Sequence, residues 1–270
     1  MIDRMHGKES LGTAVVTGAS AGIGKIYADR LAGRGYDLLL VARRGDRLNQ
    51  LADKLRSDYD VAVRTMATDL ASPAALEKVA EAISSDETIT MLVNNAGTST
   101  LAPLAATGTG AAAAMTDVNI TALVQLTLAI IPKFKERGRG TIINIGSVLG
   151  FHTLPVSSIY SGTKGYVLNF TRGLQDELAG SGVKVQLVLP AATATDIWEI
   201  SGVPLSALDQ ASIMTPENMV DAALAGLDQG ETITLPSVED FKLFEEYDAA
   251  RMKLLVASQT GKAASRYTLG

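Results

Sequence analysis

The chain has 270 residues and a mass of 28.3 kDa, enough to bury the core of one large domain or two small ones. It contains no cysteine and two histidines, which excludes a disulfide scaffold, a thiolate or histidine-rich metal centre and a cysteine nucleophile. The net charge of −5 and the pI near 5.1 argue against nucleic acid or an anionic membrane as the main partner.

Two segments bear on targeting. Residues 1–9 carry charges and no apolar core, so we expect no signal peptide. Between Glu87 and Lys133 the only charged residue is Asp117, but polar residues and glycines interrupt this stretch, so we expect no membrane span. The expectation is a soluble protein of the reducing cytoplasm.

Short apolar runs alternate with helical stretches along the chain. Strands are predicted at residues 13–17, 36–42, 61–67, 88–93, 141–145, 183–189 and 231–235. Helices are predicted at residues 22–32 and 47–57, from Ser72-Pro73 onward, at 111–131, from Thr215 to near Gly230, and at 239–257.

The predicted strands are continuously apolar, which indicates burial on both faces. Alternation with helices then gives a doubly wound α/β fold, a parallel sheet of about seven strands flanked by helices on both faces. We expect a single domain over residues 1–270, with a substrate flap at about 191–214 and a C-terminal helical tail at about 237–270.

A glycine-rich turn follows the first predicted strand, with the sequence Thr17-Gly18-Ala19-Ser20-Ala21-Gly22-Ile23-Gly24. Gly18 permits the tight turn, Gly22 lets the backbone approach a pyrophosphate, and Gly24 allows close packing of helix and strand. The helix N-terminus offers free N–H groups to an anion. No Gly-Lys-Ser/Thr is present, so a P-loop is not supported, and the turn predicts a dinucleotide site.

The spacing Gly-x-x-x-Gly-x-Gly resembles that of the classical short-chain dehydrogenase/reductase family. Further motifs of this family occur in order over roughly residues 12–235: Asp69, Asn94-Asn95-Ala96-Gly97, Asn119, Ser147, Tyr160, Lys164, Pro190 and Thr195. The resemblance implies a Rossmann fold and an oxidoreductase. It implies cofactor contacts from Gly18, Ser20, Gly22, Ile23, Gly24, Arg43, Arg44, Asp69, Leu70, Asn95, Ala96, Gly97, Tyr160, Lys164, Pro190, Thr193 and Thr195, and no metal site.

The end of the second strand distinguishes the two nicotinamide dinucleotides. An acid there would accept from the ribose 2′-OH, whereas this chain has Arg43 and Arg44, and its first acid is Asp46. Guanidinium groups suit a phosphate dianion, so we expect NADP(H) to be preferred over NAD(H). Ala21 departs from the pattern, because many NADP-preferring relatives have a basic residue in the glycine turn.

Four residues are the predicted catalytic set: Asn119, Ser147, Tyr160 and Lys164. Tyr160 and Lys164 are spaced i, i+4, on one helix face, and an ammonium about 5 Å away favours tyrosinate by about two pKa units. We therefore expect Tyr160 to titrate near working pH and act as acid/base, with Ser147 holding the substrate oxygen. The resemblance implies that Lys164 contacts the nicotinamide ribose and that Asn119 holds a water linking Lys164 to solvent.

Two positions depart from the family pattern. Gly146 stands where relatives often have a serine, and Ala191 stands where they commonly have a glycine. A positive φ at Ala191 would strain the backbone.

The substrate side is predicted to be apolar. The flap carries Ile197 and Trp198, and Leu149, Phe151 and Leu154 are expected to complete the pocket. The expected substrate is an apolar ketone or aldehyde, or the matching alcohol.

The predicted helix at 111–131 is apolar nearly all round, so one side should cover the sheet and the other should need a partner. The resemblance implies pairing through this helix and the tyrosine-bearing one, as a homodimer or homotetramer.

Two other functions remain open. A non-catalytic NADP(H)-binding regulatory protein would have no use for the tyrosine–lysine pair. An S-adenosylmethionine-dependent transferase would explain the glycine turn but not that pair. Turnover of a carbonyl compound would distinguish a dehydrogenase from the regulatory protein, and cofactor titration would distinguish it from the transferase.

Overall fold

The computed structural model describes residues 10–267 and divides the chain into two compact units, residues 1–236 and 237–270. Residues 1–9, to which the prediction about a signal peptide applies, and residues 268–270 lie outside the described part.

The first unit is built on one seven-stranded sheet with the order β3-β2-β1-β4-β5-β6-β7, and every neighbouring pair is parallel. The strands are β1 (Thr13–Thr17), β2 (Asp37–Ala42), β3 (Val63–Ala67), β4 (Ile89–Asn94), β5 (Gly140–Ile145), β6 (Val183–Val188) and β7 (Ile233–Thr234). The order reverses at β1, which lies between β2 and β4. Such a switch point leaves a crevice beyond the carboxyl ends of the strands, where ligands bind in this fold class.

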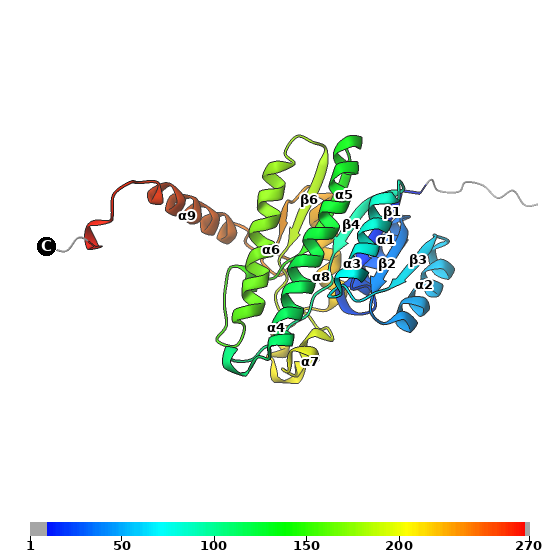
Figure 1. Cartoon of the computed structure of the whole chain (residues 1–270), viewed down its shortest axis with the longest axis horizontal. Helices are drawn as coiled ribbons and strands as arrows, with labels where there is room; N and C mark the ends of the chain where they lie inside the picture. The colour runs from blue at the N-terminus through cyan, green and yellow to red at the C-terminus, as the bar shows by residue number, and fades with distance from the viewer. Residues whose placement is uncertain (1–9, 268–270) are drawn as a thin grey trace, which may run out of the picture. The chain divides into compact units, whose positions relative to one another are not determined.

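Helices cover both faces of the sheet, which confirms the predicted doubly wound fold (Figure 1). One face is covered by α1 (Gly22–Arg34), α2 (Gly45–Tyr59) and α8 (Pro216–Asp228). The other is covered by α3 (Pro73–Ser85), α5 (Leu123–Arg137) and α6 (Ser158–Glu177). The remaining segments of this unit are α4 (Thr109–Thr116), α7 (Ile197–Ser201), a π-helical segment (Asp117–Ala122), and 3-10 turns at Leu104–Ala106, Val148–Gly150, Leu205–Ala207 and Gln210–Ser212.

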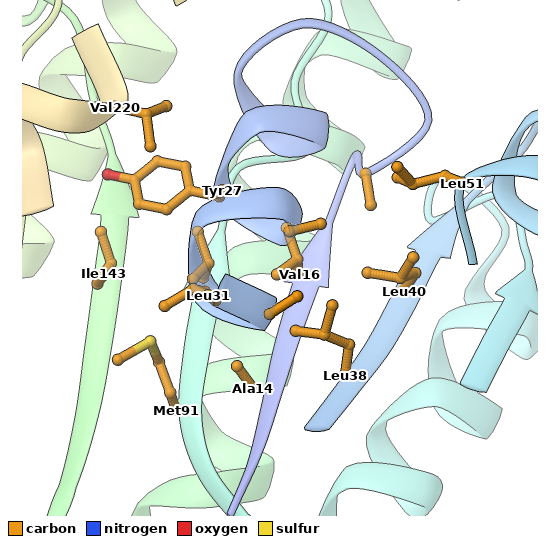
Figure 2. Packing of buried hydrophobic residues seen from close by; sticks show 14 of the residues in the cluster. Ala14, Val16, Tyr27, Leu31, Leu38, Leu40, Leu51, Met91, Ile143 and Val220 are labelled. Atoms are coloured by element: carbon orange, nitrogen blue, oxygen red, sulfur yellow. The ribbon is translucent and has the colours of Figure 1, made fainter. Parts of the chain in front are cut away.

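Successive side chains of a strand pack alternately into two hydrophobic clusters, one on each face of the sheet. Ala14 and Val16 of β1 pack in the cluster with α1, whereas Val15 packs in the cluster with α3 and α5. Figure 2 shows Tyr27 of α1 among the side chains of the first cluster. Two buried layers on one sheet explain why Ala14, Val15 and Val16 are all apolar although they point alternately to opposite faces.

The structure differs from the predicted elements mainly at the seventh strand and the long apolar helix. β7 pairs over only Ile233–Thr234, shorter than the predicted five-residue run. The helix predicted at 111–131 extends from Thr109 to Arg137, but the π-helical turn interrupts it and it contains Pro132. By length and composition, Thr109–Arg137 could cross a membrane, although a core helix passes the same test, and its buried side lies on the sheet.

The second unit contains the helix α9 (Lys242–Ser258) and a 3-10 turn, Ser265–Tyr267. Phe244 is buried, and its ring lies 5.6 Å from that of Phe241 and 5.8 Å from that of Tyr247.

Candidate active site

The glycine-rich turn connects β1 to α1 and brings bare backbone to the carboxyl edge of the sheet. Gly18 and Gly22 adopt φ of +67° and +51°, which side chains rarely allow. A Cβ on Gly22 would lie 3.0 Å from the Thr195 side chain, and one on Gly24 would lie 2.5 Å from the Gly18 carbonyl oxygen. The N-cap residue Ala21 makes no side-chain cap, so the first N–H groups of α1 remain available to an anion.

A cleft of about 540 Å³ opens at this turn. All but one of the predicted cofactor residues line it: Gly18, Ser20, Gly22, Ile23, Arg43, Arg44, Asp69, Leu70, Asn95, Ala96, Gly97, Tyr160, Lys164, Pro190, Thr193 and Thr195. Gly24 does not line the cleft, because it lies behind the turn against Gly18, where it permits the close packing of helix and strand.

Hydrogen bonds join the segment after β4 to β1. Thr17 Oγ1 accepts from the backbone N–H groups of Asn95 and Ala96, both at 2.9 Å. The side-chain amide of Asn95 donates to the Thr17 carbonyl oxygen at 2.8 Å. These bonds hold two walls of the cleft in one arrangement across the switch point.

The two arginines after β2 lie at one end of the cleft. Arg44 Nε donates to Ser20 Oγ at 3.3 Å, which ties the arginine to the glycine-rich turn. Its Nη1 is 3.2 Å from Oδ2 of Asp196, and Arg47 Nη1 is 3.4 Å from the same oxygen. Arg43 and Arg44 thus carry positive charge at the cleft, where the sequence predicts the cofactor phosphate.

Ser147, Tyr160 and Lys164 meet inside the cleft. Ser147 follows β5, and its hydroxyl forms a hydrogen bond with that of Tyr160. Lys164, one turn further along α6, is buried, and its Nζ donates to the Ile145 carbonyl oxygen at 2.8 Å. Lys164 Nζ lies 5.8 Å from the centroid of the Tyr160 ring. The hydroxyls of Ser147 and Tyr160 and the buried amine of Lys164 therefore belong to the same cleft.

Burial has the largest effect on the pKa values of Tyr160 and Lys164. It raises the pKa of Tyr160 to about 12, although the hydrogen bond with Ser147 lowers it. It lowers the pKa of Lys164 to about 8. The expectation that Tyr160 titrates near working pH is therefore wrong for the protein without bound ligand, because removal of the phenol from water has the largest effect on its pKa.

Asn119 lies in the π-helical turn and is buried. Its Oδ1 accepts from Thr98 N at 2.9 Å, and its Nδ2 donates to Thr98 O and Thr163 Oγ1, each at 3.0 Å. Thr163 Oγ1 donates to the Tyr160 carbonyl oxygen at 2.8 Å. Asn119 does not line the cleft; both N–H groups of its amide have partners, whereas Oδ1 accepts one hydrogen bond and can accept a second.

The predicted flap lies over the cleft and is anchored at its base. Thr193 forms an isolated parallel β-bridge with Met214, and Trp198 Nε1 donates to the Thr193 carbonyl oxygen at 2.8 Å. Leu101 N donates to the Ser201 carbonyl oxygen at 3.0 Å, which joins the flap to the segment after β4.

Four of the five predicted substrate residues line the cleft: Leu149, Leu154, Ile197 and Trp198. Phe151 does not line it and is 38% exposed, because the 3-10 turn Val148–Gly150 carries the chain away before Phe151 is reached. Ala191 has no positive φ, so the backbone strain considered for this position does not arise.

Sequence reasoning missed several lining residues, among them Leu101, Val118 and Asp196. Leu101 follows the Asn94–Gly97 motif after three hydroxyl residues, and its closeness to that motif is a usable signal. Asp196 follows Thr195, but its pairing with Arg44 depends on two segments 152 residues apart.

Residues 12–202 match the family described as short chain dehydrogenase. The very-long-chain 3-oxoacyl-CoA reductase-A of Danio rerio is 38% identical over 215 residues, which are 78% of this chain and only 65% of that protein. A solved short-chain dehydrogenase from Sphingobium yanoikuyae, in complex with NADPH, is 41% identical, with a TM-score of 0.92 over 96% of this chain and 100% of its own. The bulky-bulky ketone specific alcohol dehydrogenase from Comamonas testosteroni is 36% identical, with a TM-score of 0.88 over 97% of this chain and 100% of its own.

Proposed function

The chain belongs to the short-chain dehydrogenase family of oxidoreductases, and on that premise we propose that it interconverts a bulky apolar ketone or aldehyde and the corresponding alcohol with NADP(H). The observation that carries this proposal is the meeting of Ser147, Tyr160 and Lys164 in a cleft that also contains the glycine-rich turn and two arginines.

The residues of the cleft fit a dinucleotide. The free N–H groups of α1 and the bare backbone at Gly22 suit the diphosphate, and Arg44 with Arg43 suits a 2′-phosphate. Asp69 and Leu70 lie where the adenine is expected. The nicotinamide supplies a hydride to the carbonyl carbon when NADPH is bound.

Three side chains perform the remaining chemistry. The Tyr160 hydroxyl donates its proton to the carbonyl oxygen, and its raised pKa keeps it protonated until that step. Ser147 holds the same oxygen as negative charge develops on it. Lys164 stabilises the phenolate left on Tyr160, because a buried ammonium interacts strongly with a negative charge at short range, and a proton from solvent then restores the phenol. In the oxidative direction each transfer reverses.

The flap end of the cleft supports an apolar substrate. The side chains there include Leu101, Leu149, Leu154, Ile197 and Trp198. The charged residues Arg43, Arg44 and Asp69 come from the segments after β2 and β3. The relatives whose names include a very-long-chain 3-oxoacyl-CoA and a bulky-bulky ketone are consistent with a large carbonyl compound.

A panel of carbonyl compounds tests the function, with NADPH and NADH each offered as reductant. We expect turnover of bulky apolar ketones with NADPH and little turnover of small charged ones. Binding of NADPH with no turnover of any carbonyl would instead support the regulatory protein. A preference for NADH would show that the role assigned to Arg43 and Arg44 is wrong.

We also propose that two copies pair through α5 and α6. Leu128 of α5 is 63% exposed in the single chain, and Tyr166 of α6 is 45% exposed with its ring stacked on Phe170. Large apolar side chains gathered on neighbouring helices favour a protein partner. Sedimentation should give a dimer or tetramer at micromolar concentration, and a monomer would contradict the pairing.

A further inference from the structure

Asp196 is a carboxylate placed among the arginines of the proposed cofactor site. Its Oδ2 lies 3.2 Å from Arg44 Nη1 and 3.4 Å from Arg47 Nη1. Arg44 also binds Ser20 of the glycine-rich turn, so its guanidinium is held at the cleft. Two guanidinium groups that share one oxygen form a site that binds an anion. Here that anion is the carboxylate of Asp196, which belongs to the chain itself.

All three side chains remain accessible to solvent. Their exposed fractions are 43% for Arg44, 55% for Arg47 and 49% for Asp196. An ion pair this exposed is weak and screened by salt. A phosphate dianion, which accepts from a guanidinium through two oxygens, is the stronger partner and can displace the carboxylate.

We infer that Asp196 is a specificity-determining residue that competes with the 2′-phosphate of NADP(H) for Arg44 and Arg47, and so reduces the preference of the protein for NADP(H) over NAD(H). The inference rests on the proposed function, which places that phosphate at the arginines. It adds Arg47, which no sequence motif indicates, to the phosphate site. NAD(H) has no group that displaces Asp196, so its affinity does not depend on this competition.

Competition between Asp196 and the phosphate also affects the flap, because Asp196 is part of it. Asp196 immediately precedes α7 and follows Thr195, whose side chain lies against Gly22 of the glycine-rich turn. Trp198, two residues later, lines the cleft. When a phosphate binds the arginines, Asp196 of the flap loses its ionic partners beside the cofactor, so cofactor choice and flap anchoring are linked through one carboxylate.

Direct nucleotide titration tests this inference without turnover, by the fluorescence of NADPH and NADH on binding. Asp196→Asn and Asp196→Ala should both lower the Kd for NADPH, by about three- to fivefold at low salt, as expected for loss of an exposed ion pair. The Kd for NADH should stay nearly constant. The gain should shrink as salt is raised.

Glu199→Gln provides the matched control. It removes one negative charge from α7, the short helix that Asp196 precedes, at a residue that does not line the cleft, so it should not reproduce the effect. An NADPH Kd that is unchanged or raised in both Asp196 variants overturns the inference, as does an equal gain in Glu199→Gln.

The outcomes also distinguish this inference from the proposed cofactor. If the unchanged protein prefers NADPH and Arg44→Ala abolishes that preference while the Asp196 variants do nothing, the cofactor proposal stands and only the role of Asp196 fails. If the unchanged protein does not prefer NADPH, both fail together.

Discussion

Lys164 Nζ lies 5.8 Å from the centroid of the Tyr160 ring and donates to the carbonyl oxygen of Ile145 at 2.8 Å. Ile145 is the last residue of β5, and Ser147 follows it two positions later. One strand end therefore positions the serine directly and the lysine through a hydrogen bond, while α6 carries both the lysine and the tyrosine. The relative placement of the three groups depends on how α6 packs against β5.

Removal of the Tyr160 hydroxyl should stop the chemistry and spare the cofactor. Tyr160→Phe keeps the ring but removes the proton donor, so kcat for carbonyl reduction should fall by about 10²- to 10⁴-fold. The Kd for NADPH, measured by titration, should change little. Tyr166→Phe is the control, because Tyr166 lies on the same helix but is exposed and stacked on Phe170. Comparable turnover in Tyr160→Phe and the unchanged protein would refute the assignment.

The buried amine should make stability depend on pH. The pKa of Lys164 is lowered from 10.5 to about 8, so between these pH values the unfolded chain binds more protons than the folded one. The free energy of unfolding should therefore rise with pH across this window, by roughly 3 kcal/mol in total. Lys164→Met should lose this rise.

Urea denaturation between pH 7.5 and 10 measures the difference. Above pH 10 the raised pKa of Tyr160 acts in the opposite direction, because the folded protein keeps the phenol proton longer and stability falls. Both proteins retain this tyrosine, so subtraction isolates the lysine. Lys135→Met, a change at an exposed position of α5, should keep the pH slope of the unchanged protein. Equal slopes for Lys164→Met and the unchanged protein would show that the amine is not desolvated.

Asn119 should be important for stability although it does not line the cleft. Asn119→Ala leaves the N–H and carbonyl of Thr98 and the hydroxyl of Thr163 without their amide partner. Loss of these three hydrogen bonds, one of them fully buried, should lower the free energy of unfolding by about 2–4 kcal/mol. Asn169→Ala is the control, because Asn169 is exposed and makes one long bond to the Gly165 carbonyl oxygen. Similar urea midpoints for the two variants would contradict the argument.

Arg44 should determine the choice between the two cofactors. Arg44→Ala removes a charge-assisted hydrogen-bond donor from the proposed phosphate site, so the Kd for NADPH should rise roughly 10- to 100-fold. The Kd for NADH should hardly change. Arg139→Ala, which removes an exposed arginine between α5 and β5, is the control for net charge. An equal loss of affinity for both nucleotides would mean that Arg44 acts on a feature the two cofactors share.

The parts of the fold that depend on local pattern were predictable. Continuous apolar runs indicated strands buried on both faces, and the two clusters that Val15 and Val16 serve are the physical reason. The π-helical turn at Asp117–Ala122 was not predictable, because nothing in the apolar period of 111–131 marks where one residue is inserted.

The candidate site likewise combines features that were predictable from the sequence with features that were not. Leu149 and Leu154 line the cleft, whereas Phe151, which follows the 3-10 turn Val148–Gly150, does not. The pKa of Tyr160 was predicted in the wrong direction, since the spacing to Lys164 is visible in the sequence and the burial of the phenol is not.

The sequence by itself determined the order of the strands and helices, the glycine-rich turn and which groups are candidates for the chemistry. These features follow from side-chain period, turn chemistry and motif spacing, all of which act over a few residues. Only the tertiary structure decided how strongly burial shifts Tyr160 and Lys164, and that Asp196 reaches Arg44 from 152 residues away. Desolvation and charge pairing depend on everything packed around a group, and that environment exists only once distant segments have come together.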